Sequence, residues 1–118
     1  FRRVLFRSYP GTPVYSPNSG FIQPAHGLTE ATARVIGFAV DTMNPTESGR
    51  IAIAGRIPLT GSYTHGSYLY LGDDSGELTD VVPEDPPNGP YPFGFNLVQL
   101  GIVDGSHLII QIVPIGTL

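Results

Sequence analysis

Glycine and proline recur so often along this chain that they limit which regular structures can form. The 118 residues include 15 glycines and 12 prolines, and no segment free of both is longer than nine residues. Helices usually need ten or more uninterrupted positions, and an interior glycine or proline costs roughly 1 or 3 kcal/mol. The sequence therefore predicts an all-β fold with essentially no helix. At this length we expect one domain around one core.

Four apolar runs predict how the strands are connected. Two runs that end in aspartate, 33–41 (ARVIGFAVD) and 98–104 (VQLGIVD), each precede a turn and a second run, 50–57 (RIAIAGRI) and 107–113 (HLIIQIV). This order predicts two hairpins of the same design, with residues 33–40 as a single strand. The likeness extends upstream, so we interpret residues 14–61 and 69–118 as two related β-units. Packed together, they predict a small antiparallel barrel or sandwich within residues 9–118.

Residues 1–8 (FRRVLFRS) differ in character from the rest. They hold three of the six arginines and have no counterpart ahead of the second unit. The segment resembles the adapter-derived leaders found at the broken ends of translated metagenomic reads. We therefore expect a non-native leader on a chain that began further upstream, and a genuine N-terminal strand is the alternative.

The long strands are apolar on both faces. In the first run Val35 and Ala39 face one way, and Ile36, Phe38 and Val40 face the other. In the last run Ile109 and Val113 face one way, and Leu108, Ile110 and Ile112 face the other. Antiparallel sheets normally place polar side chains on their wet face, so two apolar faces predict that both are covered. A chain of this size has little left to cover the second face. We therefore predict a subunit interface, with Ile109, Val113 and Val35 as candidate interface residues.

Tyrosines form a second candidate surface. In residues 67–71 the aromatic side chains of Tyr68 and Tyr70 alternate with Leu69 and Leu71, which predicts a strand with its leucines in the core. Aromatic faces stack on sugar rings, and tyrosine hydroxyls supply hydrogen bonds. The candidate glycan-binding residues are Tyr63, Tyr68, Tyr70 and Tyr91. The alternative is that these tyrosines line a seam between subunits.

Composition argues against several function classes. The net charge is -4, the pI is near 5.1 and lysine is absent, so the clustered positive charge that phosphate backbones require is missing. No apolar run approaches the length of a membrane span. Without cysteine there is no disulfide framework and no thiolate metal site. We expect neither nucleic-acid binding nor a membrane partner.

Residues capable of catalysis or metal binding are present but poorly arranged. His26, His65 and His107 lack the spacing typical of zinc ligands, and DDSGELTD at 73–80 does not match a calcium loop. Ser67 lies near His65 in sequence, yet no nucleophile elbow surrounds it. We predict no enzyme activity, no catalytic residues, no metal and no cofactor.

Three segments together resemble small β-rich domains of tailed-bacteriophage and prophage virion proteins. They are AHGLT and ATARVIGF within 25–38, YLYL followed by GELT within 68–79, and, after a proline-rich stretch, VQLGIV at 98–103. Leu71 is followed by glycine where the pattern often has serine. The resemblance implies a non-enzymatic part of a tail fibre, head fibre or capsid decoration.

The resemblance also implies partners and a location. Such domains are usually homotrimers that contact other virion proteins and in some cases a host surface glycan. The expected location is the phage particle, after synthesis in the cytoplasm of a bacterial host. The trimer is implied by the family alone, whereas the covered second face is predicted from the residues.

Overall fold

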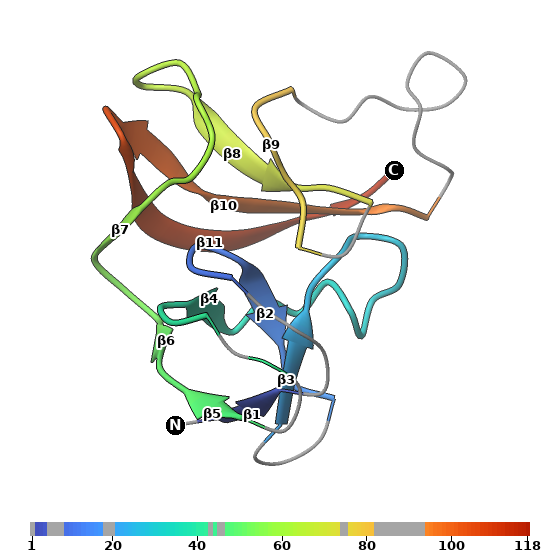
Figure 1. The fold of residues 1–118 in the computed structure, drawn as a ribbon. Helices are drawn as coiled ribbons and strands as arrows, with labels where there is room; N and C mark the ends of the chain where they lie inside the picture. Colours follow the sequence, from blue (N-terminus) through green and yellow to red (C-terminus); the bar gives the residue numbers. More distant parts are fainter. Residues whose placement is uncertain are drawn as a thin grey trace.

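The computed structural model describes residues 2–4, 9–17, 21–42, 44, 47–73, 76–81 and 94–118. Over these residues the chain consists of strands, turns and irregular segments, and no helix occurs in them. The strands form two sheets that lie one over the other, with the N-terminal half of the chain in one and the C-terminal half in the other (Figure 1). The predicted all-β fold is confirmed.

The N-terminal sheet contains six short strands in the described part of the chain. Across the sheet they follow the order β5 (Ser48–Gly49), β1 (Arg2–Val4), β3 (Phe21–Pro24), β2 (Pro13–Tyr15), β4 (Gly37–Ala39) and β6 (Ile51–Ala52). The pairs are antiparallel except β1 with β3, which is parallel. Strand β1 lies within residues 1–8, and the non-native origin of that segment stays a prediction.

The C-terminal sheet contains the two longest strands. Its order is β7 (Arg56–Pro58), β11 (His107–Thr117), β10 (Asn96–Asp104), β8 (Tyr68–Leu71) and β9 (Leu78–Thr79). The predicted hairpin of β10 and β11 is confirmed, with Asp104 opposite His107 and a two-residue loop between them. Gly105 opens that loop at φ +63°, the positive value that tight hairpin turns require of their first residue.

The first predicted hairpin is shorter than expected. Strand β4 covers only Gly37–Ala39, so the prediction of one strand over residues 33–40 is wrong. Ala33 instead closes a turn by donating its N–H to the Thr29 oxygen at 3.1 Å, and Val35 donates to the Ala33 oxygen at 2.9 Å. These local hydrogen bonds compete with sheet pairing and hold the backbone out of the strand.

The apolar run at 50–57 is divided between the two sheets. Strand β6 ends at Ala52 beside β4, and β7 begins at Arg56 beside β11. Between them Gly55 has φ +90°, a conformation that side-chain-bearing residues rarely adopt, and it turns the chain into the second sheet. The prediction that the two hairpins share one design is therefore wrong at this point. The assignment of residues 14–61 and 69–118 as repeated units stays a prediction.

One core is shared by both sheets. Ala33 and Phe38 come from the N-terminal half, and they pack with buried residues of the C-terminal sheet: Ile57, Leu69, Leu71, Val98, Leu100, Val103 and Leu108. The predicted core position of Leu69 and Leu71 is confirmed. A smaller cluster of Val14, Ile22 and Ala39 lies within the N-terminal sheet. The arrangement is a two-layer sandwich, as expected when two sheets each bury one apolar face.

An ion pair connects the two sides of the turn between β4 and β6. Arg50 donates to Asp41 from its backbone N–H at 3.0 Å and from Nη2 at 2.8 Å. Hydrogen bonds from the Arg50 side chain, and then from its backbone, lower the pKa of Asp41 from 3.8 to about 2. Because the folded pKa lies below the ordinary one, this contribution to stability is present above about pH 4. It is lost as the pH falls through about 2.

We expect the Asp41 carboxyl to titrate near pH 2 when followed by NMR. Replacing Arg50 with glutamine removes the charged donor and should raise the Asp41 pKa toward 3.8, with little change in the spectrum elsewhere. Arg34→Gln, which breaks the separate pair with Glu30, is the control and should leave Asp41 unchanged. An Asp41 pKa near 4 in the unmodified chain would contradict the bonded geometry.

Candidate functional site

The solvent-facing side of the C-terminal sheet carries the site. Along β8 and β11 the alternate residues Leu69, Leu71 and Leu108 are buried, so the residues between them project away from the core. We call this surface the outer face, and it consists of Tyr68, Tyr70, Gln99, Ile102, Ile109, Gln111 and Val113. It spans three neighbouring strands.

Cross-strand pairing orders the outer face into two rows. In the first row Ile102 lies between Tyr68 on β8 and Ile109 on β11. In the second row Gln99 lies between Tyr70 and Val113. Aromatic and β-branched neighbours of this kind pack against one another across strands. The two rows give a continuous surface of apolar and tyrosine side chains that also contains Gln99 and Gln111.

Large apolar side chains of the outer face remain in contact with solvent. The exposed fraction is 45% for Tyr68 and 41% for both Ile109 and Val113. Gln99 Nε2 donates to Gln111 Oε1 at 3.5 Å, so the two amides lie together on the surface. None of the seven residues carries a formal charge. Burial of this surface by a partner would remove apolar area from water without desolvating an ion.

Charged groups lie at one end of the outer face. Beside the turn between β10 and β11, Asp104 contacts Arg56 Nη2 at 3.1 Å and His65 Nδ1 at 3.8 Å. His65 Nδ1 also accepts the Gly105 N–H at 3.0 Å. These contacts fix the turn against the loop that precedes β8. They therefore give the long hairpin a defined position in the sheet.

Two of the predicted groups of site residues lie on one surface. The candidate interface residues Ile109 and Val113 and the candidate glycan residues Tyr68 and Tyr70 lie on the same outer face. Tyr63 instead packs against the core, where burial, and next the negative charges of Asp80 and Glu77, raise its pKa. Tyr91 lies outside the described residues.

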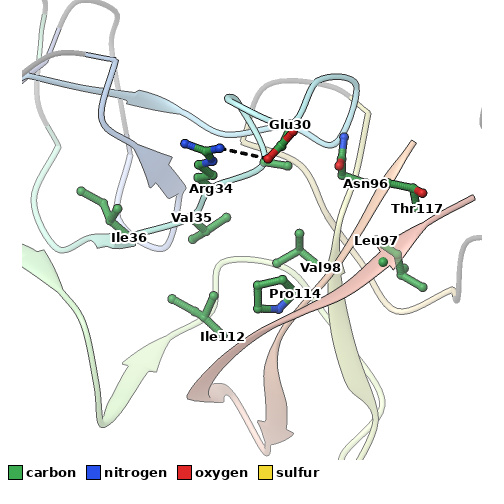
Figure 2. Close-up of a pocket in the computed structure, with 12 residues that line it drawn as sticks. Glu30, Arg34, Val35, Ile36, Asn96, Leu97, Val98, Ile112, Pro114 and Thr117 are labelled. Carbon is green, nitrogen blue, oxygen red and sulfur yellow. Dashed lines mark hydrogen bonds and ion pairs between the residues drawn. The ribbon is translucent and has the colours of Figure 1, made fainter. Parts of the chain in front are cut away.

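Val35 belongs to a different surface. It lines a groove of about 550 Å³ beside β11, together with Glu30, Ala33, Arg34, Ile36, Asn96, Leu97, Val98, Ile112, Pro114, Gly116 and Thr117. Figure 2 shows Val35 and Ile36 on one side of the groove and Ile112 and Pro114 on the other, with the Arg34–Glu30 ion pair near its rim. The groove is mostly apolar and lies against the inward side of β11.

Sequence reasoning missed the groove and missed Ile102. The Ile102 position could have been found by counting back from the two-residue turn, because Asp104 opposite His107 puts Ile102 opposite Ile109. The groove could not, because its two walls come from residues 30–36 and from the ends of β10 and β11. No local pattern connects these segments.

The histidines are held in separate local contacts. His26 Nδ1 lies 3.3 Å from Thr32 Oγ1, and His107 Nδ1 lies 3.3 Å from Ser106 Oγ. Within the described ranges no group of three histidine or carboxylate side chains is placed to hold a metal ion. The same part of the chain contains no helix long and apolar enough to cross a membrane.

Comparison of the chain with protein-family models, curated proteins and solved structures found no match. What the site can do is therefore argued from its geometry. An uncharged, partly apolar sheet surface with exposed isoleucine, valine and tyrosine suits contact with another polypeptide or with a sugar ring.

Proposed function

We propose that this chain is a non-enzymatic structural domain of a virion protein, and that it assembles with copies of itself through the outer face. The observation that carries the proposal is the exposure of Ile109, Val113 and Tyr68 on one face of the C-terminal sheet, whose seven residues carry no charge. Fully burying such a side chain contributes roughly 1.5–3 kcal/mol, and part of this is still to be gained at each of these positions.

The charge distribution favours a second copy as the partner. The chain carries a net charge of -4, so two copies repel one another over much of their surfaces. The seven outer-face residues carry no charge, and the charged Arg56 and Asp104 at one end pair with each other, so copies can meet there with little repulsion between like charges. Gln99 and Gln111 retain donors and acceptors that can bond across such a contact.

The virion assignment is supported by the resemblance of residues 25–38, 68–79 and 98–103 to phage fibre and decoration domains. It implies a homotrimer in the phage particle, in contact with other virion proteins and made in the cytoplasm of a bacterial host. The full-length gene should then lie among genes for other virion parts. A gene that lies among metabolic genes would argue against this assignment.

The mass of the purified protein tests the assembly. We expect light scattering to give about three times the chain mass of 12.6 kDa, with a concentration dependence that reports association. A mass of 12.6 kDa at every concentration up to the solubility limit would overturn the proposal.

A monomeric glycan-binding module is the second candidate. Tyr68 and Tyr70 project from the same side of β8, which separates them by two residue steps, or roughly 7 Å. NMR titration with soluble oligosaccharides should then shift the outer-face signals, and Tyr68→Ala should abolish the shifts. Tyr63→Ala is the matched control, because that side chain packs against the core. A trimer without sugar-induced shifts would favour the first proposal.

A further inference from the structure

Strand β11 has a long edge with no partner in the described part of the chain. On one side it pairs with β10 over most of its length. On the other side β7 pairs with His107–Ile109 only, and Gly55 accepts the N–H of Ile110. From residue 111 to residue 117 no described strand pairs with this side. We call residues 111–117 the free edge.

The free edge differs from every other sheet edge that the structure describes. The edge strands β5, β6, β7 and β9 have two or three residues each. Very short edge strands and charged side chains are the usual protection against edge-to-edge pairing. The free edge is seven residues long and contains no lysine, arginine, aspartate or glutamate. Its protective features are Pro114, which supplies no N–H, and the register shifts of β11 against Leu97–Val98 and Gln99–Gly101. They limit a ladder to the residues between these points.

Space for the side chains of an added strand is available beside this edge. The groove lies along the inward side of the same residues, with Ile112 and Pro114 in one wall and Val35 and Ile36 in the other (Figure 2). A strand that pairs with the free edge places every second side chain over the groove and the others level with the outer face. The groove therefore suits a strand that is apolar on both sides, and β11 is such a strand.

We infer that the free edge pairs antiparallel with the free edge of a second copy and joins two C-terminal sheets into one. This inference rests on the proposed self-assembly and adds a second contact to it, because a two-fold edge pair joins chains in twos, whereas the trimer that the resemblance implies uses the outer face. Antiparallel self-pairing about a two-fold axis places the residue at the axis opposite its own copy and pairs the residues on one side of the axis with those on the other. All cross-strand neighbours then come from the free edge itself, which is unfavourable for a charged edge and favourable for a β-branched one. The free edge offers Ile112, Val113 and Ile115 and no charge.

Cysteine scanning tests the pairing directly, because the chain has no cysteine of its own. Single cysteine variants at each position from 111 to 117 are oxidised and analysed on non-reducing gels, because only the residue at the two-fold axis lies opposite its own copy. A disulfide needs Cα atoms within about 7 Å, a distance that paired strands provide. Ile102→Cys is the control, since edge pairing leaves its two copies three strand spacings apart, about 14 Å.

We expect cross-linked dimers from at least one free-edge position and none from Ile102→Cys. As a second readout, Ile115→Lys should weaken association at least tenfold in sedimentation, whereas Ile53→Lys, at a position that is 70% exposed and directly follows β6, should not. Cross-linking at Ile102 alone would overturn the edge pairing and leave assembly through the outer face intact. A chain that is monomeric in every measurement would overturn both.

Discussion

Ile109→Asp is expected to give a folded chain that no longer assembles. Ile109 points outward from β11 and is 41% exposed, so an aspartate there keeps its carboxylate in water and disturbs the core little. In an assembly that buries the outer face, the same carboxylate loses its hydration and meets Ile102 and Tyr68 on one side. Its neighbour on the other side is Arg56 of β7, which already pairs with Asp104 and offsets only part of that cost. We expect the association constant to fall by about a hundredfold or more, close to 3 kcal/mol. Light scattering measures the mass, and circular dichroism confirms the fold.

Ile110→Asp is the matched control, since it changes the same residue type one position along the strand. Ile110 packs against the shared core, so its aspartate variant buries a charge and should lose about 4 kcal/mol of folding stability. The pair therefore separates loss of assembly from loss of folding. If Ile109→Asp remains fully assembled, or if both variants unfold alike, the outer face is not the assembly surface.

Gly101→Ala is expected to destabilise the domain although it leaves every exposed residue unchanged. Gly101 sits in β10 opposite Leu69 and Ile110, where the pairing of β10 with both neighbours changes register. A Cβ at this position would overlap the carbonyl oxygen of Ile109 and lie 2.9 Å from Leu108 Cδ1. Because the obstacle includes backbone, it cannot rotate away, and we expect a loss of about 3 kcal/mol. Chemical denaturation measures it.

Gly66→Ala separates this steric effect from the general effect of replacing a glycine. Gly66 has φ +85° and open space around the position of a Cβ, so its alanine variant carries only the backbone strain, roughly 1 kcal/mol. The Gly101 variant should also assemble poorly, because Ile102 and Ile109 flank the distorted segment. Equal stability losses in the two variants would contradict the close approach of β10 and β11.

Local patterns were sufficient to predict the hairpin of β10 and β11 and the orientation of β8. The turn at residues 104–107 fixes the register of β10 and β11, and the alternation of tyrosine with leucine fixes which side of β8 enters the core. Both signals act between residues close in sequence. The alternation of side chains in β8 and β11 is therefore enough to select Tyr68, Tyr70, Ile109 and Val113 as candidate site residues.

The first half depended on interactions that no local pattern contains. Residues 33–35 look like strand, yet local hydrogen bonds to Thr29 and Ala33 hold them in a turn, and bonding to β2 begins where Ile36 donates its N–H to the Val14 oxygen. The run at 50–57 looks continuous, yet its ends pair with β4 and with β11. Which of Ile109 and Ile110 faces outward was likewise open, because both are apolar and only packing of the two sheets distinguishes them.

The passage from β6 to β7 has a consequence for how the chain reaches its native state. Residues up to 52 build one layer and residues from 56 onward build the other, so three residues connect two locally assembled halves. The tight hairpin of β10 and β11 can form early as a template, whereas pairs such as β7 with β11, whose residues lie about 50 apart in sequence, require closure of a long loop. Collapse of the first layer onto that template would complete folding. A slow step, if observed, should therefore report docking of the layers.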